Sequence, residues 1–242
     1  SRHAIWVGGG VVAGRFGSFL CDAASQTLQA AGIADTTLHR ADHPSLLPLI
    51  GSARRLPPSD TGALVFDFGA SFVKRAVASF VDGALVSMRL LTPVPTPAFT
   101  PEGSDDYADA QTEAIADALV AVMAATWQEA HGSGISLAPA SAVSVAGYVR
   151  DGWLLPRQKG LYATLHALPE RADYWLARQL SERVGGEHTI ELLHDGTAAA
   201  QVYAGTPNSA VILLGTALGV GFPSIDGSSL RPLGSDFTIV DI

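Results

Sequence analysis

The sequence has little cysteine and little charge. Its one cysteine, Cys21, excludes an intrachain disulfide and any metal site built from several cysteines, and it fits a reducing cytoplasm. Charged residues make up only 16% of the 242, and the net charge of -8 argues against nucleic acid as the main partner. A phosphorylated ligand stays compatible with this surface, because backbone N–H groups can bind phosphate.

Long apolar runs and a leader segment are lacking as well. The most apolar run, residues 114–125, is interrupted by Asp117, so we expect no membrane-spanning helix and no membrane partner. No charged and then apolar segment opens the chain, so no signal peptide is expected and the protein is predicted to be cytoplasmic. The 48% of hydrophobic residues suffice for a sizeable core.

Two stretches of the sequence share one design, which is strand, glycine turn, strand, Asp-Gly, strand. The first covers residues 63–90 and contains Asp82-Gly83, and the second covers residues 210–233 and contains Asp226-Gly227. An Asp-Gly pair supplies the positive φ angles of a tight hairpin turn. The repetition predicts a duplicated architecture with two similar sheets.

The glycine turn of each stretch has residues suited to phosphate. Asp67 ends an apolar strand beside Gly69, where a carboxylate could hold a magnesium-bound phosphate. In the second stretch, glycine N–H groups and the Thr216 hydroxyl could cradle phosphate oxygens. Taken singly, each motif is explained better as an ordinary glycine hairpin.

Two further junctions join a strand to a helix. Gly8, Gly9 and Gly10 lie at the first, where a nucleotide can bind near a helix N-terminus. Their spacing is not G-x-G-x-x-G, and no acidic residue follows at the required distance, which disfavours a dinucleotide-binding Rossmann site. Asp195 lies at the second junction, where it is either a helix cap or a general base for a hydroxyl nucleophile.

Other catalytic classes have little support. The seven histidines show no H-x-x-x-H spacing, so His166 and His194 are interpreted as surface or hydrogen-bonded core residues rather than metal ligands. No G-x-S-x-G sequence is present, which disfavours a serine hydrolase.

In combination, these segments resemble the actin-like ATPase and sugar kinase superfamily, and within it the ROK group of bacterial sugar kinases and repressors. The likeness extends over nearly the whole chain. The segments that carry it are Asp67-Phe68-Gly69-Ala70-Ser71 with Lys74, Leu214-Gly215-Thr216-Ala217-Leu218-Gly219-Val220-Gly221, Val7-Gly8-Gly9-Gly10-Val11, Leu193-His194-Asp195-Gly196-Thr197-Ala198-Ala199-Ala200 and Val145-Ala146-Gly147.

The resemblance implies an α/β fold of two ribonuclease H-like lobes with pseudo-duplicated sheets and a cleft between them. It implies ATP-dependent phosphoryl transfer to a sugar hydroxyl, with ATP and Mg as cofactors and a sugar as the small-molecule partner. Asp195 falls on the family's catalytic aspartate, and Asp67 would hold Mg through water. The residues implied to contact the nucleotide are Gly8, Gly9, Gly10, Gly69, Ala70, Ser71, Lys74, Gly215, Thr216, Gly219 and Gly221, and those implied to contact the sugar are Gly147 and His194.

The order of the segments differs from the family's order. There the D-x-G hairpin comes first and the G-G-G segment last, whereas here the G-G-G segment opens the chain. We interpret this as a circular permutation, with residues 1–60 as the adenosine side of the ATP lobe, 61–205 as the first phosphate and substrate lobe, and 206–242 as the second phosphate hairpin. That residues 1–60 are the tail of a fused copy stays open.

The sequence also departs from the family's motifs. The E-x-G-H sugar motif and the Cys-rich zinc motif are not found in these 242 residues, His194 replaces the usual Asn, and Ala70 replaces the usual Gly. Nucleotide binding is therefore better supported than sugar binding. A non-catalytic sugar- or nucleotide-sensing domain stays open as the alternative to an enzyme, as does a subunit that completes its site through homodimerisation.

Overall fold

The structure is a computed structural model. It describes residues 3–33, 35–57, 59–97, 105–156, 160–216 and 218–241, with only the backbone for 105–110. Those residues form a mixed α/β fold with a six-stranded, a four-stranded and a two-stranded sheet. The elements are β1 (His3–Gly8), α1 (Gly10–Ala13), α2 (Gly17–Ala30), β2 (Thr36–Arg40), α3 (Leu47–Ala53), β3 (Gly62–Phe68), β4 (Phe72–Val81), β5 (Ala84–Pro95), α4 (Asp105–Gly132), β6 (Leu137–Val145), β7 (Val149–Arg150), β8 (Trp153–Leu154), η1 (Ala163–Ala167), α5 (Ala172–Val184), β9 (Thr189–His194), α6 (Asp195–Ala200), η2 (Gln201–Tyr203), β10 (Ser209–Leu214), β11 (Leu218–Gly221) and β12 (Leu233–Val240).

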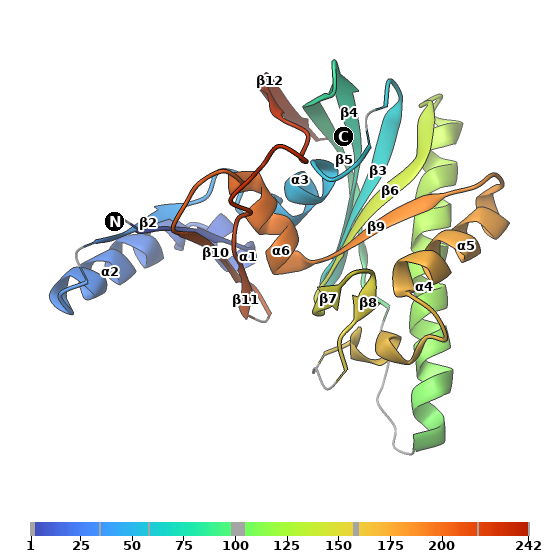
Figure 1. The fold of residues 1–242 in the computed structure, drawn as a ribbon, viewed down its shortest axis with the longest axis horizontal. Helices are drawn as coiled ribbons and strands as arrows, with labels where there is room; N and C mark the ends of the chain where they lie inside the picture. The colour runs from blue at the N-terminus through green and yellow to red at the C-terminus, as the bar shows by residue number, and fades with distance from the viewer. Residues whose placement is uncertain are drawn as a thin grey trace.

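The six-stranded sheet has the order β12-β5-β4-β3-β6-β9. The strands β3, β4 and β5 form an antiparallel meander, while β6 and β9 run parallel to β3. In Figure 1 the helices α4 and α5 lie along one face of this sheet, and α3 and α6 lie between it and the four-stranded sheet. The central strands are therefore covered by helices on both faces, which is why β3 is an almost continuous apolar run.

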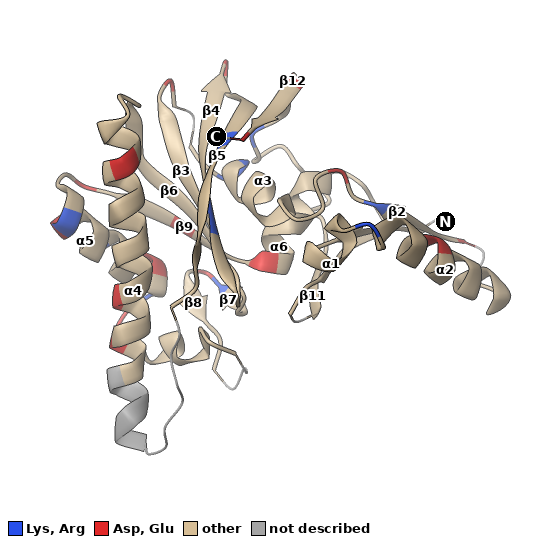
Figure 2. Cartoon of the chain, turned by 180° about the vertical axis from the view of Figure 1, so that it is seen from behind, with Lys and Arg blue, Asp and Glu red and all other residues tan. Residues whose placement is uncertain are grey.

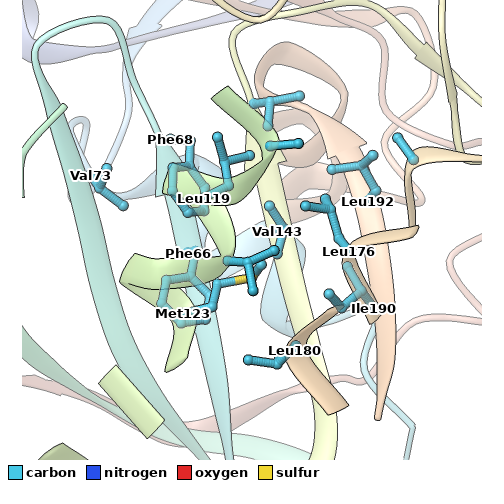
Figure 3. Packing of buried hydrophobic residues seen from close by; sticks show 14 of the residues in the cluster. Phe66, Phe68, Val73, Leu119, Met123, Val143, Leu176, Leu180, Ile190 and Leu192 are labelled. Atoms are coloured by element: carbon cyan, nitrogen blue, oxygen red, sulfur yellow. The ribbon is translucent and has the colours of Figure 1, made fainter. Parts of the chain in front are cut away.

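Successive side chains of β3 point to opposite faces of the sheet, and each face has its own hydrophobic core. Phe66 and Phe68 point toward α4 and α5, where Leu119, Met123 and Leu176 pack against them (Figure 3). The opposite face is made largely of alanine, which lets α3 lie close to the sheet. Its buried side chains from the sheet include Ala63, Val65, Ala76, Ala78, Ala140 and Ala142. Because successive side chains of a strand point to opposite faces, Asp67 belongs to the alanine-rich face.

The four-stranded sheet joins the first two strands of the chain to β10 and β11. Its order is β11-β10-β1-β2, with β1 parallel to both β10 and β2. The strand 4–7 therefore lies beside strand 209–214, which is the pairing that the permutation hypothesis requires. Leu47 of α3 packs under this sheet with Val211 and Leu213, so α3 contacts both sheets.

The two Asp-Gly pairs behave differently. Asp82 and Gly83 have φ angles of 50° and 76°, which confirms the predicted tight turn between β4 and β5. The predicted second hairpin is wrong, because Asp226 forms only a local turn in which its Oδ1 accepts from Ser228 N at 2.8 Å. The following strand, β12, pairs in parallel with β5 of the other sheet, where Phe237 and Ile239 pack on the alanine-rich core.

Charge is sparse along the ribbon, and most of both sheets is uncharged (Figure 2). In the part of the chain that is described, no helix has the length and apolar character needed to cross a membrane.

Candidate active site

The main candidate site is a cavity of about 240 Å³, here called the aspartate cavity. The carboxyl ends of β1, β3, β6 and β10 and the start of α6 all contribute to it, which is the usual place for ligands in open α/β sheets. Its lining residues are Gly9, Gly10, Ser45, Pro48, Asp67, Gly69, Ala70, Ser71, Phe72, Lys74, Ala146, Asp195, Leu213, Gly215 and Thr216.

Asp67 is held by both neighbouring strands. In the register of the sheet it lies opposite Lys74 on β4 and Ser144 on β6. Lys74 Nζ is 2.8 Å from Asp67 Oδ2, and Ser144 Oγ donates to Asp67 Oδ1 at 2.9 Å. Asp67 is only 4% exposed, so the paired lysine, rather than bulk water, stabilises its negative charge.

The glycine turn after β3 is held by two hydrogen bonds to the carbonyl oxygen of Gly69. Thr96 Oγ1 and the Tyr162 hydroxyl donate to Gly69 O at 2.8 and 3.0 Å. Burial raises the pKa of Tyr162, so its hydroxyl keeps the proton that it donates. The Gly69 N–H donates to Phe72 O at 3.1 Å and is not free for phosphate, contrary to its predicted role. The next two amides, of Ala70 and Ser71, have no hydrogen-bond partner within the described residues.

Asp195 is the first residue of α6, and His194 is its N-cap. The cap role considered for Asp195 is therefore wrong, since His194 Nδ1 accepts the Thr197 N–H instead, at 3.4 Å. Asp195 Oδ1 accepts from Gly196 N at 2.6 Å and lies 3.0 Å from His194 Nε2. The Asp195 side chain is 24% exposed and lines the aspartate cavity, as a general base would have to.

The turn at Gly8–Gly10 also borders the aspartate cavity, which Gly9 and Gly10 line. Gly9 has a φ of 94°, and a Cβ there would lie 2.3 Å from Leu214 O. Only glycine therefore lets the end of β1 approach the end of β10 this closely. Gly10 faces open space, whereas Gly8 packs inward, where a Cβ would lie 2.6 Å from Leu47 Cδ1.

The last two glycines of the second motif lie on β11, beside α6. A Cβ on Gly221 would lie 1.8 Å from Gly196 O, and a Cβ on Gly219 would lie 3.5 Å from Asp195 Oδ1. Neither residue lines the aspartate cavity. Gly221 therefore lets β11 lie directly on α6, whereas a Cβ on Gly219 would make only ordinary contact with Asp195.

No family model and no curated protein matches the chain. Among solved structures, it is similar to a ROK family glucokinase from Streptomyces griseus in complex with glucose and AMPPNP, at 25% identity and a TM-score of 0.41, over 70% of this chain and 46% of that one. It is also similar to a ROK hexokinase from Thermus thermophilus, at 22% identity and a TM-score of 0.34, over 69% and 46%.

Both of these structures are ROK kinases, the group that the sequence motifs resemble. The chain spans about half the length of each, at 46%.

The aspartate cavity brings together most of the residues singled out in the sequence, although their roles stay predictions. Those that line it are Gly9, Gly10, Asp67, Gly69, Ala70, Ser71, Lys74, Asp195, Gly215 and Thr216. Those that do not are Gly8, Gly147, His194, Gly219 and Gly221. His194 instead lines a separate cavity of about 480 Å³ with Thr197 and Arg150, here called the histidine cavity.

Sequence reasoning missed three residues that hold the site: Thr96, Ser144 and Tyr162. Ser144 gave one usable signal, because it is a polar residue inside the apolar strand 141–145. Its partner Asp67 is 77 positions away, and only the strand register reveals the pair.

The residues of the aspartate cavity fit a magnesium ion that is held through water better than one bound directly by the protein. Magnesium binds through one or two carboxylates, water and substrate phosphates rather than through an all-protein cage. Asp67 and Asp195 are the carboxylates here, and both oxygens of Asp67 already accept hydrogen bonds from Lys74 and Ser144. Contact through water is therefore the better fit. No group of three metal-binding side chains occurs among the described residues.

Proposed function

We propose that this chain carries out ATP-dependent phosphoryl transfer to a sugar hydroxyl. The observation that supports this best is the meeting of Asp67, Lys74 and Asp195 in one cavity bordered by three glycine-containing turns. A lysine with a buried carboxylate suits a triphosphate, and a second, partly exposed carboxylate suits an acceptor hydroxyl.

The roles of the residues follow from their surroundings. Asp195 would accept the hydroxyl proton, a contribution of roughly 100- to 10,000-fold for a positioned general base. Lys74 and the N–H groups of Ala70 and Ser71 would bind the phosphate oxygens, where fixed donors stabilise charge that develops in the transition state. Magnesium, when bound, would neutralise phosphate charge, with Asp67 holding it through water.

The size of the cavity limits what it would hold. At about 240 Å³ it is smaller than the ~300–1,000 Å³ typical of small-molecule sites. We therefore propose that it takes the phosphates and the reacting hydroxyl, with the adenosine beside Gly9 and Gly10 and the rest of the sugar outside. Closure around both ligands would exclude water and limit wasteful ATP hydrolysis.

The proposed architecture is a circularly permuted, two-lobed actin-like fold. The parallel pairing of β1 with β10 supports it, because the first strand of the chain joins the sheet of the last glycine turn. The boundaries 1–60, 61–205 and 206–242 are part of this proposal.

A non-catalytic sensing domain is the second candidate. The occupation of both Asp67 oxygens by Lys74 and Ser144 favours it, since the carboxylate is already satisfied within the protein.

The test is to incubate the wild-type chain with Mg-ATP and a panel of hexoses and amino sugars, measuring ADP and sugar phosphate, with ATP affinity by calorimetry. The kinase proposal predicts Mg-dependent ATP binding and ADP release that depends on one sugar. Binding without transfer to any sugar would favour the sensing domain. Failure to bind ATP would contradict both nucleotide proposals.

A further inference from the structure

His194 is a buried polar residue, 8% exposed, at the end of β9. Both of its ring nitrogens face the first turn of α6. The Thr197 backbone N–H can only donate, so Nδ1, at 3.4 Å, must be the acceptor. The ring proton of the neutral histidine therefore belongs on Nε2, which lies 3.0 Å from Asp195 Oδ1.

This arrangement treats the two oxygens of Asp195 differently. Oδ1 accepts from Gly196 N at 2.6 Å and from His194 Nε2–H at 3.0 Å, so two donors are directed at the same atom. Oδ2 has no hydrogen-bond partner within the described part of the chain. It is the oxygen left to meet a ligand in the aspartate cavity.

The imidazole ring is itself held in place. Tyr148 stacks on it with ring centroids 4.7 Å apart and planes inclined by 26°. A Cβ at Gly196 would lie 2.9 Å from His194 Cε1, so a side chain at that position would push against the ring. The ring is thus held by its stacking on Tyr148 and by the contacts of its two nitrogens, and its Nε2–H has a defined direction.

We propose that His194 is a positioning residue that turns the Asp195 carboxylate so that Oδ2 alone takes the substrate proton. The proposal rests on the kinase function proposed above, and it replaces the sugar contact that the sequence suggested for His194. Because His194 does not line the aspartate cavity, it would act only through Asp195. Misplacement of a reacting group by about 1 Å can cost roughly 100-fold in rate, so loss of this hydrogen bond should lower kcat.

The test compares His194→Gln with His194→Met. The amide nitrogen of Gln takes the place of Nε2 and can donate to Asp195 Oδ1, while Met has a similar length and no donor. Both variants lose the acceptor for Thr197 N–H, so both should melt at a similarly lowered temperature. We expect kcat of His194→Gln within about 3-fold of the wild type and kcat of His194→Met lowered about 10- to 100-fold, with the KM for ATP and sugar unchanged.

Equal kcat values for the two variants would overturn the proposal and leave His194 as a helix cap. A second measurement does not depend on activity: ¹⁵N NMR of the wild-type imidazole should show a protonated Nε2 and an unprotonated Nδ1 at neutral pH. The opposite tautomer would overturn the proposal even in an active kinase. If the wild type phosphorylates no sugar, the proposed function fails, and the tautomer still decides whether His194 orients Asp195.

Discussion

Asp67 and Lys74 face each other across neighbouring strands of the six-stranded sheet, with Lys74 Nζ 2.8 Å from Asp67 Oδ2. The aspartate side chain is 5% exposed and the lysine side chain 33%. The pair is therefore asymmetric: the carboxylate is fixed in the sheet, and the ammonium group reaches toward the aspartate cavity. Under the proposed function, Lys74 would exchange its carboxylate partner for a phosphate without movement of the strand.

Lys74→Met should destabilise the protein, because it leaves the buried Asp67 charge without its partner. Breaking a fully buried pair costs ~3–5 kcal/mol, and the partial exposure of Lys74 reduces this to about 1–3 kcal/mol here. Urea denaturation measures the change. As a control, Lys74→Met combined with Asp67→Asn should recover part of the loss, since the neutral amide needs no counter-charge. Equal stability of the wild type and Lys74→Met would show that the pair contributes nothing.

Asp195→Asn should abolish most phosphoryl transfer without unfolding the protein. The helix keeps its cap, because that cap is His194, and an amide oxygen can still accept from Gly196 N. If Asp195 is the general base, as proposed, the variant should lower kcat by ~100-fold or more, while ATP affinity and the melting temperature stay close to the wild type. A coupled assay and calorimetry measure these quantities. Transfer at a near wild-type rate would show that Asp195 is not the base.

The strands and the glycine turns could be predicted from the sequence because both depend on short local patterns. The Asp-Gly pair predicts the hairpin at Asp82, and the positive φ angles there bear this out. The pairing of β12 with β5 was missed because no local signal records which sheet edge a strand joins. Asp226-Gly227 has the same turn chemistry as Asp82-Gly83 but no partner strand to complete a hairpin.

The candidate site was predictable to the extent that its residues lie in short motifs. Asp67, Lys74 and Asp195 were found in this way. The contacts that orient them were not, because each depends on strand register or on a side-chain rotamer. The bond from Ser144 to Asp67 requires the register of β3 with β6, and the link from His194 to Asp195 requires the ring orientation at the start of α6.

Gly9→Ala should destabilise the whole protein, whereas Gly10→Ala should not. Gly9 has a φ of 94° and no room for a Cβ, which would lie 2.3 Å from Leu214 O. The strained backbone alone costs ~1–3 kcal/mol, so we expect a loss of about 2 kcal/mol or more. Gly10 lies in α1 with nothing within 4 Å of its Cβ position, and alanine there should be neutral or stabilising by up to ~1 kcal/mol.

Gly9→Ala also separates the permutation hypothesis from the fusion hypothesis. If residues 1–60 belong to the same cooperative unit as β10, Gly9→Ala shifts one unfolding transition that all probes report together. If residues 1–60 are instead the tail of a fused copy, Gly9→Ala leaves the main unfolding transition unchanged and shifts only a minor phase at lower urea concentration. Circular dichroism and tryptophan fluorescence followed during urea denaturation distinguish the two outcomes.

The stability of the protein should fall as the pH drops below neutral, partly because of His188. This residue is 6% exposed and packs edge-on against Trp127, with ring centroids 4.5 Å apart. Burial lowers its pKa in the folded protein, and the backbone of Gly186 opposes the shift only in part. The unfolded chain, with a histidine pKa of about 6.5, therefore binds the proton before the folded protein does.

It follows that the contribution of His188 is complete above pH ~6.5 and is lost as the pH falls toward its lower folded-state pKa. His188→Phe keeps an aromatic ring against Trp127 and removes the titrating group, so its free energy of unfolding should decrease less between about pH 6.5 and 5. Urea denaturation at a series of pH values gives both curves, and an NMR titration of the His188 ring gives the folded-state pKa directly. Parallel curves for the two proteins, or a ring that titrates at or above ~6.5, would show that burial does not disfavour the charged histidine here.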